Sequence, residues 1–395
     1  MGNLKVLFLP SWYPTRHNPL HGIFIKKHAE AAANYCSVMV LYVTEKSEIN
    51  KTYEFDFVNE NDVHTLRVYY KRSVLKSPAA KLVNGTRYIA AGYKGLKAVQ
   101  NKYGKPDLVH LNVAFPAGLL ALLFKLTYKM DYVITEHWSI YTEQSGAYKN
   151  LSYFLKLLIR VVFRYAEGIH TVSNYLLRSL KGLGLSSEKT FVIPNSVDIQ
   201  PCLHRTPHQH MVKLITVCLL KDEIKNITGL LLAFKQIADS YKNVQLDVVG
   251  DGQDRTHLEN TAKELGLLNT KVFFHGYIPN DKLNKYFDHA NFFVLNSNFE
   301  TFSAVTIEAM AYGLPVVVTR CGGPEEFVSS DVGILVEKQS TESLVNGIEY
   351  MINNWHRYNS NVIKDYVRRE FGSDVIGKRI YDMYQAVQEG NPGDD

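Results

Sequence analysis

Two glutamates in the last third of the chain, Glu300 and Glu308, have the type and spacing to bind a ligand rich in hydroxyl groups. Seven residues separate them. They lie where a strand pattern at 292–295 gives way to a helix pattern at 306–312. A carboxylate accepts strong hydrogen bonds from neighbouring hydroxyls, so Glu308 can hold both hydroxyls of a ribose while Glu300, nearer the loop, faces a sugar. The spacing therefore predicts a site for a nucleotide sugar.

The residues between that strand and that helix are suited to the phosphates of such a ligand. They are Thr301, Phe302 and Ser303. Free backbone N–H groups at a helix start, together with the helix dipole, favour a bound diphosphate, and the small side chains of Thr301 and Ser303 let it approach. The alternative is that Glu300 and Glu308 are ordinary surface acids, because glutamate is among the most exposed residue types.

Strand and helix patterns alternate along the whole chain, which is typical of doubly wound α/β folds. A length of 395 residues fits two such domains, and we expect them at 1–198 and 199–373. Ligands of open parallel sheets bind beyond the carboxyl ends of the strands, so the facing rims of the two domains should form the cleft. The expected strands are 5–9, 38–43, 108–111, 132–135, 168–172, 213–217, 245–249, 272–275, 292–295, 316–318 and 333–336.

Cysteine and hydrophobic patterns narrow the class of protein further. The four cysteines are far apart and form no Cys-x-x-Cys pair, so neither a zinc site nor a disulfide framework is predicted. His204, His208 and His210 share a short loop, for which a solvated linker is favoured over a metal site. No stretch reads as a signal peptide or a membrane span. We expect a cytoplasmic chain, soluble or peripheral on the inner face of the membrane.

Positive charge is concentrated in the first half of the chain. Residues 1–200 carry a formal net charge of +11 and the remainder −6, which together give the total of +5. Much of the excess lies at 71–105, where apolar residues recur at helical spacing between the cations. Such a basic amphipathic helix can rest on anionic lipid or recruit an anionic acceptor. The alternative is a solvated helix that packs its apolar stripe on the domain core.

The string from Asn296 to Val328 resembles the Glu-x7-Glu signature of retaining glycosyltransferase family 4. It includes Glu-Ala-Met-Ala-x-Gly-Leu-Pro-Val-Val and a trailing Gly-Gly. The resemblance covers nearly the whole chain and implies a GT-B fold, with two doubly wound Rossmann-like domains facing across a cleft. It also implies that the first domain is on the acceptor side, that the second binds the donor, and that a last helix at about 374–395 returns to the first domain.

The resemblance also implies donor contacts in the second half. Family members carry Gly-Arg and then a lysine after the first strand of this domain. Lys225 matches that lysine, but the arginine is missing, and Lys221 would have to supply the second cation from a shifted position. Tyr277 and Ile278 lie in a segment that resembles the family's base-contacting loop. Gly250 belongs to a Gly-x-Gly after a strand, which without the third glycine of a dinucleotide fingerprint is weak evidence for the donor site.

Two segments of the first half resemble family motifs as well. The opening loop from Pro10 onward leads to Gly22, which heads an expected helix at 23–33 and would let the loop close over phosphate and sugar. The alternative is a tight turn without ligand contact. His137 follows an expected strand and resembles the family histidine that lies under the donor sugar. With Glu300, His137 is the implied catalytic residue.

The function that the resemblance implies is retaining transfer of a hexose-type sugar from UDP or GDP to a glycan or lipid-linked acceptor, as in surface polysaccharide biosynthesis. No metal, other cofactor or nucleic acid is expected, and the chain has no Asp-x-Asp metal clamp. Two alternatives stay open: a GT-B nucleotide-sugar epimerase, and a donor-binding partner subunit without turnover, which the missing arginine would suit. The base, sugar, acceptor, linkage and oligomeric state are not encoded in any motif.

Overall fold

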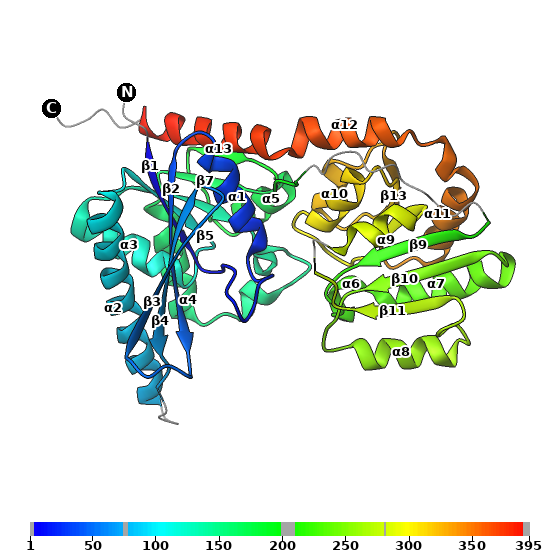
Figure 1. The fold of residues 1–395 in the computed structure, drawn as a ribbon, viewed down its shortest axis with the longest axis horizontal. Coiled ribbons are helices and arrows are strands. Elements are labelled where there is room, and N and C mark those ends of the chain that lie inside the picture. The colour runs from blue at the N-terminus through cyan, green and yellow to red at the C-terminus, as the bar shows by residue number, and fades with distance from the viewer. Residues whose placement is uncertain (1–3, 74–77, 199–209, 280–281, 390–395) are drawn as a thin grey trace. The chain divides into compact units, whose positions relative to one another are not determined.

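A computed structural model describes residues 4–73, 78–198, 210–279 and 282–389 (Figure 1). The chain divides into two compact units, Met1–Ser196 with Ser373–Asp395 (unit 1) and Val197–Gly372 (unit 2). His204 and His208 of the histidine-containing loop lie outside the described residues, as does 74–77 of the basic segment. Among the described residues, no helix has the length and apolar character needed to cross a membrane.

Unit 1 is built on an eight-stranded sheet, counted over the described residues, in the order β3-β4-β2-β1-β5-β6-β7-β8. Only the β3–β4 pair is antiparallel within this sheet. The chain leaves β1 toward β2 on one side and later toward β5 on the other, so the carboxyl ends of β1 and β5 mark the point where such sheets bind ligands. The strands are β1 (Lys5–Pro10), β2 (Ser37–Lys46), β3 (Tyr53–Glu60), β4 (Val63–Lys71), β5 (Leu108–Asn112), β6 (Tyr132–Glu136), β7 (Gly168–Thr171) and β8 (Thr190–Val192).

Helices cover the sheet of unit 1, and the last helix of the chain is one of them (Figure 1). They are α1 (Ile23–Ala33), α2 (Pro78–Tyr103), α3 (Ala117–Tyr128), α4 (Tyr153–Arg164), α5 (Asn174–Gly182) and α13 (Ser373–Gln388). A Cβ on Gly377 of α13 would lie 2.1 Å from the carbonyl oxygen of Ala31, so the α1–α13 approach requires glycine there. Ile380 and Met383 of α13 are buried in the same core as β1 and β2.

Helix α2 contains most of the basic segment and directs its apolar stripe inward. Tyr88 and Leu96 are buried in unit 1, whereas Leu82 near the start of the helix is 72% exposed. Lys94 and Lys102 lie over the rings of Tyr53 and Phe57 on β3, with the ammonium nitrogens 5.5 and 4.6 Å from the ring centroids. The structure therefore shows the arrangement in which the stripe packs on the domain core.

Unit 2 contains an all-parallel sheet, six-stranded within the described residues, in the order β11-β10-β9-β12-β13-β14. This is the strand order of dinucleotide-binding folds, and the order reverses between β9 and β12. The strands expected in this half are present and differ by at most one residue at either end. They are β9 (Val212–Val217), β10 (Val244–Val249), β11 (Val272–Gly276), β12 (Phe292–Leu295), β13 (Val316–Thr319) and β14 (Gly333–Val336).

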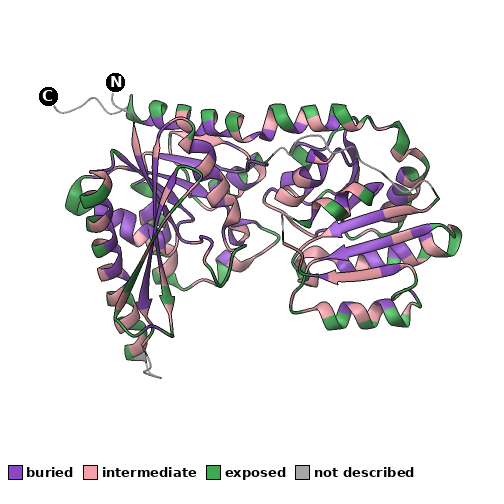
Figure 2. Ribbon diagram, viewed as in Figure 1, coloured by how far each residue is buried: buried purple, intermediate pink, exposed green. Residues whose placement is uncertain are grey.

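The helices of unit 2 enclose that sheet, whose strands are largely buried while the outward faces of the helices are exposed (Figure 2). Apolar runs such as Phe292–Leu295 are buried on both faces, as expected for a parallel strand between helices. The helices are α6 (Asp222–Lys225), α7 (Ile227–Ser240), α8 (Arg255–Glu264), α9 (Asn284–His289), α10 (Ala304–Ala311), α11 (Thr341–Asn354) and α12 (Ser360–Phe371).

Candidate functional site

Two loops meet at the switch point of unit 2, one after β9 and one after β12. The backbone N–H of Asn298 donates to the carbonyl oxygen of Ile224 at 2.7 Å, and its side-chain amide donates to the carbonyl of Glu223 at 2.9 Å. The Asn296 amide donates to the carbonyl of Asn226 at 2.8 Å. These bonds fix the end of α6 against the loop that leads to α10.

Lys225, the last residue of α6, forms an ion pair with Glu300 in that loop. The Lys225 ammonium donates to Oε1 of Glu300, and the hydroxyl of Ser297 donates to the same oxygen at 2.7 Å. Their side chains are 18% and 12% exposed, so the pair is largely shielded from water. Burial lowers the pKa of Lys225, but the charge of Glu300 and the hydrogen bond to it outweigh burial and hold that pKa above 10.5. The structure thus brings together two predicted site residues.

The loop beyond Glu300 leads into α10 and is held by the segment that follows β13. The N–H of Glu300 donates to the carbonyl of Cys321 at 2.8 Å, and the N–H of Gly323 donates to the carbonyl of Glu300 at 2.9 Å. A Cβ on Gly323 would lie 2.3 Å from the carbonyl oxygen of Thr301. Gly323, the second glycine of the Gly-Gly after β13, is therefore needed for this close approach.

The N-terminus of α10 presents unpaired donors. The helix begins at Ala304, two residues before the expected 306, because Ser303 adopts a left-handed φ of 70° and its hydroxyl hydrogen-bonds that of Thr306 at 2.8 Å. Among the described residues, the backbone N–H groups of Phe302 and Ser303 have no hydrogen-bond acceptor. Such donors, with the helix dipole behind them, suit an anionic group.

Phe302 and Glu308 differ in what they can offer a ligand. The ring of Phe302 is 3% exposed and packs on Phe327 and Phe371, with centroids 5.2 and 6.0 Å away. It anchors the loop, so the backbone amide is the part of Phe302 that a ligand can reach. Glu308 is the fifth residue of α10 and is partly exposed.

The other predicted donor residues lie along the same edge of the sheet. Lys221 immediately precedes α6 and is 39% exposed, with its ammonium 3.6 Å from Oε2 of Glu223. Tyr277, which is 47% exposed, and Ile278 follow the edge strand β11. Gly250 directly follows β10 with a φ of 133°, and a Cβ there would lie 1.8 Å from the carbonyl oxygen of Cys218. Loop packing therefore requires glycine at position 250.

In unit 1, Gly22 closes the long loop between β1 and α1. Its φ is 71°, and a Cβ there would lie 2.5 Å from the carbonyl oxygen of Trp12. Its own carbonyl accepts from the N–H of Ile25 at 3.0 Å and so starts the helix, whose bounds are those expected from the sequence. Glycine is required here because the loop folds back on itself.

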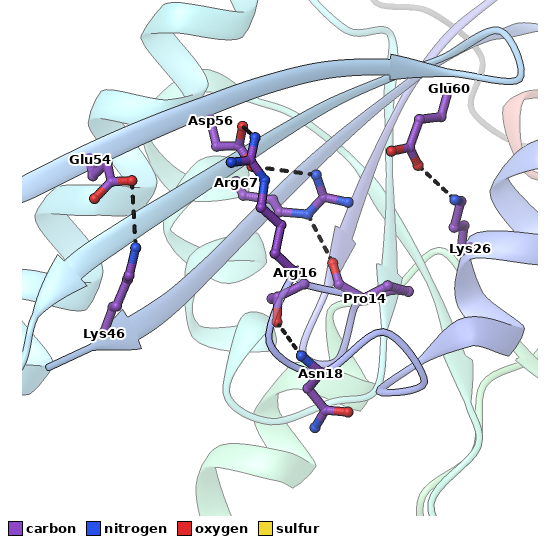
Figure 3. Close-up of polar contacts among 10 residues, drawn as sticks. Pro14, Arg16, Asn18, Lys26, Lys46, Glu54, Asp56, Glu60 and Arg67 are labelled. Carbon is purple, nitrogen blue, oxygen red and sulfur yellow. Dashed lines mark hydrogen bonds and ion pairs between the residues drawn. The ribbon is translucent and has the colours of Figure 1, made fainter. Parts of the chain in front are cut away.

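The β3–β4 hairpin, which the sequence interpretation did not include, holds this loop in place (Figure 3). The buried Arg67 guanidinium donates through Nε to the carbonyl of Pro14 at 2.8 Å. Asp56 is 3.4 Å from the guanidinium of Arg16, and Lys26 on α1 lies 2.6 Å from Glu60. The alternating apolar and acidic residues at 53–57 are the signal from which this hairpin could have been found.

His137 follows β6 and is buried, with 6% exposure. Neither ring nitrogen has a hydrogen-bond partner among the described residues. The ring centroid lies 4.6 Å from that of Phe24 and 5.6 Å from that of His28. Burial, with the neighbouring histidines, lowers the pKa of His137 well below 6.5, so near neutral pH the imidazole is uncharged and can donate one hydrogen bond and accept another.

Glu136 fixes the backbone around His137, although the sequence interpretation assigned it no role. Its Oε1 accepts from the N–H groups of His137 and Trp138, both at 2.9 Å, and its Oε2 accepts from the N–H of Ala114 at 3.1 Å. Burial raises the pKa of this carboxyl to about 7, against the lowering effect of these donors. The sequence signal that could have identified Glu136 is a glutamate at the end of a strand that is otherwise suited to full burial.

A polar network runs beneath this edge of unit 1 and ties α13 to the central strands. The hydroxyl of Tyr384 on α13 hydrogen-bonds Nδ1 of His110 at 2.6 Å, and Nε2 of His110 bonds the hydroxyl of Thr135. Thr135 also bonds Nδ1 of His170 at 2.7 Å, whose Nε2 bonds the carbonyl of Ile193 at 2.7 Å. Burial lowers the pKa of His170 to about 3, so the network is uncharged.

Comparison with known families matches both halves of the chain. The model described as "Glycosyl transferases group 1" matches residues 212–368, and the model described as "Glycosyltransferase Family 4" matches residues 51–201. The "Putative teichuronic acid biosynthesis glycosyltransferase TuaC" of Bacillus subtilis strain 168 is 24% identical over 97% of this chain and 99% of its own. The "Uncharacterized glycosyltransferase MJ1607" of Methanocaldococcus jannaschii is 33% identical, but over 42% of this chain and 43% of its own.

Solved structures share the fold across the whole chain. The sucrose-phosphate synthase of Thermosynechococcus elongatus superposes with a TM-score of 0.75 at 20% identity, covering 98% of this chain and all of that one. Alr3699/HepE of Anabaena, solved in complex with UDP-glucose, gives a TM-score of 0.67 at 17% identity over 97% of this chain and all of its own. At these identities the likeness shows the fold.

Proposed function

Because the chain belongs to the glycosyltransferases of family 4 and has their GT-B fold, we propose that it is a retaining enzyme that transfers a hexose-type sugar from UDP or GDP to a glycan or lipid-linked acceptor. The name of the Bacillus relative supports a role in polysaccharide biosynthesis, and the UDP-glucose complex of the Anabaena protein supports a nucleotide-sugar donor. We place the enzyme in the cytoplasm, where such donors are made.

The observation that carries the proposal is the Lys225–Glu300 pair beside the free N–H groups that lead into α10. A cation, a carboxylate and helix-terminal amides at one switch point match the diphosphate and the sugar of one donor. Lys225 and the amides of Phe302 and Ser303 would bind the diphosphate, with Lys221 as a second cation. Glu300 would bind sugar hydroxyls.

The remaining donor contacts follow the same division of roles. Glu308 would accept from two ribose hydroxyls, and Tyr277 and Ile278 would contact the base. Thr301 and Gly250 leave room for the ligand. From unit 1, the uncharged imidazole of His137 would hydrogen-bond the sugar, and the loop ending at Gly22 would contact phosphate and sugar.

In the proposed reaction, the bond from the anomeric carbon to the diphosphate breaks and the acceptor oxygen bonds that carbon on the same face. A phosphate oxygen takes the acceptor proton, and an oxocarbenium-like transition state lies between. Charge that develops on the leaving diphosphate is stabilised by Lys225 and by the N-terminus of α10, which are fixed before the reaction begins. No metal is needed in this scheme.

Incubation with a panel of UDP- and GDP-hexoses, with and without glycan or polyprenyl-phosphate acceptors, tests this function. We expect nucleoside diphosphate release only when acceptor is present, and NMR of the product should show the donor's anomeric configuration. Interconversion of donor sugars without acceptor would indicate an epimerase instead. Donor binding without release under any condition would indicate a partner subunit that lacks turnover.

A further inference from the structure

Helix α4 of unit 1 presents large apolar side chains to solvent. Phe154 is 80% exposed, Tyr153 is 70% exposed and Leu157 is 46% exposed. The rings of Tyr153 and Phe154 contact each other with centroids 6.0 Å apart. The opposite face of α4 carries Ile159, Val162 and Phe163 into the core of unit 1. One face of the helix is therefore buried in unit 1, and the first turns of the opposite, exposed face are also apolar.

The same outer face continues as a row of cations. Residues three and four apart share one face of a helix, so Tyr153, Leu157, Arg160 and Arg164 form a single stripe, which turns from apolar to basic along α4. Arg160 and Arg164 are exposed. The helix contains no acidic residue. We call Tyr153, Phe154, Leu157, Arg160 and Arg164 the α4 surface.

The chemistry of the α4 surface selects its partner. A second copy of the chain seated on it would bury Arg160 and Arg164 with no acidic residue on the partner helix to pair with them, which costs free energy. Aromatic and leucine side chains beside arginines are the composition of helices that lie at the interface of anionic membranes. We propose that the α4 surface docks unit 1 on a bilayer that contains anionic phospholipid.

The position of the α4 surface would bring a membrane close to the carboxyl edge of the unit 1 sheet. Helix α4 begins shortly after the segment that follows His137, and that segment includes two short 3-10 helices, Ser139–Tyr141 and Ala147–Asn150. These and α5 line a cavity of about 470 Å³, whose polar residues include Glu143, Gln144, Lys149 and Arg178. Docking here would hold the headgroup of a lipid-linked acceptor at the carboxyl edge of the unit 1 sheet. This consequence rests on the proposed function, whereas the docking itself does not.

Flotation of the full chain with vesicles, without donor or acceptor, tests the docking. We expect the chain to float with vesicles of equal parts phosphatidylcholine and phosphatidylglycerol, but not with phosphatidylcholine alone, and binding should weaken as salt is added. The double variant Tyr153→Ser/Phe154→Ser should lower the partition coefficient about tenfold or more, because burial of two large apolar side chains is lost. Arg160→Gln/Arg164→Gln should weaken binding to the anionic vesicles.

Leu82→Ser on α2 is the matched control, since it removes an equally exposed apolar side chain from the basic segment of the same unit. It should leave vesicle binding unchanged, and thermal melts should show that all variants fold. Phe154→Trp should add fluorescence that brominated lipid quenches. The proposal is overturned if the wild-type chain does not float, if the double variant floats equally well, or if Leu82→Ser abolishes flotation. The proposal would also be overturned if sedimentation shows that the wild-type chain is a dimer and that the Tyr153→Ser/Phe154→Ser variant is a monomer.

Discussion

Lys225 donates a hydrogen bond to Glu300 across a separation of 75 residues in the chain. The two groups proposed to bind adjacent parts of the donor, the diphosphate and the sugar, thus hold each other at the switch point of unit 2. Ser297 donates to the same carboxylate oxygen and fixes its position. A largely buried charge is costly without its partner, so each member of the pair holds the other in place.

Replacement of Glu300 separates its role in catalysis from its role in the fold. Glu300→Gln keeps the shape but removes the charge, so we expect kcat to fall about 100-fold or more. Lys225 would lose its counter-charge, which should lower the free energy of unfolding by about 1–3 kcal/mol. Steady-state kinetics and urea unfolding measure the two effects.

Two further variants serve as controls for that experiment. Glu308→Gln should raise KM for the donor more than it lowers kcat, because the proposed ribose contact is present in both ground and transition states. Lys225→Met/Glu300→Gln should regain part of the lost stability without regaining activity. Full turnover by Glu300→Gln would remove Glu300 from the mechanism.

Chelation of metal ions tests whether protein groups alone compensate the negative charge of the diphosphate. If Lys225 and the amides before α10 supply the compensation, EDTA should leave the transfer rate within about twofold, because no metal bridges the phosphates. Lys225→Met should lower the rate in the same assay. Loss of activity in EDTA that magnesium restores would show that a metal is required.

The strands of unit 2 could be predicted from the sequence, because strands buried on both faces are short continuous apolar runs such as Phe292–Leu295. The β3–β4 hairpin was missed because it turns at Asn61-Asp62 without a glycine, although its outer strand has the alternating apolar and acidic residues of a strand. Both turn residues adopt positive φ, which Asn and Asp tolerate. The hairpin pattern was therefore present but weak.

The candidate site shows a different limit of sequence interpretation. Spacing and resemblance place Lys225 and Glu300 on loops after strands, but only strand order brings β9 beside β12 and so joins the two residues. Glu136 and the network from Tyr384 to His170 depend on side chains from distant strands that meet in the core. No local pattern encodes such meetings, because they depend on tertiary packing.

Replacement of Arg67 tests whether the β3–β4 hairpin holds the opening loop between β1 and α1 in place. Arg67→Met removes the bond to the Pro14 carbonyl, so we expect a loss of about 1–3 kcal/mol of unfolding free energy and a looser loop. Arg16 within this loop is 79% exposed at its side chain and is a ready trypsin site. Limited trypsinolysis followed by mass spectrometry should show faster cleavage after Arg16 in the variant.

Lys46→Met is the matched control for Arg67→Met. Lys46 pairs with Glu54 at 3.7 Å on the same part of the sheet but has no contact with the opening loop in the close-up (Figure 3). Its replacement should leave cleavage after Arg16 unchanged. Equal cleavage rates in Arg67→Met and the wild-type chain would show that the loop is held by other contacts.

The buried histidines of unit 1 should make its stability depend on acid. Burial lowers the pKa of His28 to about 4 and that of His170 to about 3, from 6.5. The unfolded chain therefore binds protons first as the pH falls below 6.5, and stability is lost from there down through the folded pKa values. Glu136 acts in the opposite sense between its folded pKa of about 7 and 4.5, but it is one group against several.

Urea unfolding of the full chain between pH 7 and 5 measures this dependence. We expect the unfolding free energy of unit 1 to fall by on the order of a few kcal/mol. His170→Gln should flatten the slope, whereas His17→Gln, at an exposed position of the same unit, should not. A flat profile in the wild-type chain would contradict burial of uncharged imidazoles.

Gly22 and Gly85 offer a paired test of the opening loop, because the same substitution should have opposite effects. At Gly22 an alanine Cβ would lie 2.5 Å from the Trp12 carbonyl oxygen and the residue would keep a φ of 71°. We expect Gly22→Ala to lower the unfolding free energy by about 1–3 kcal/mol. At Gly85, inside α2, nothing lies within 4 Å of such a Cβ, so Gly85→Ala should raise stability by about 0.5–1 kcal/mol.

Kinetics on the same pair would show whether Gly22 also serves the reaction. If the loop that it closes contacts phosphate and sugar, Gly22→Ala should raise the donor KM at temperatures where the variant is still fully folded, while Gly85→Ala should leave KM unchanged. A Gly22→Ala enzyme that is less stable but kinetically normal would assign this glycine to the turn alone. The proposed donor contact in unit 1 would then rest on His137.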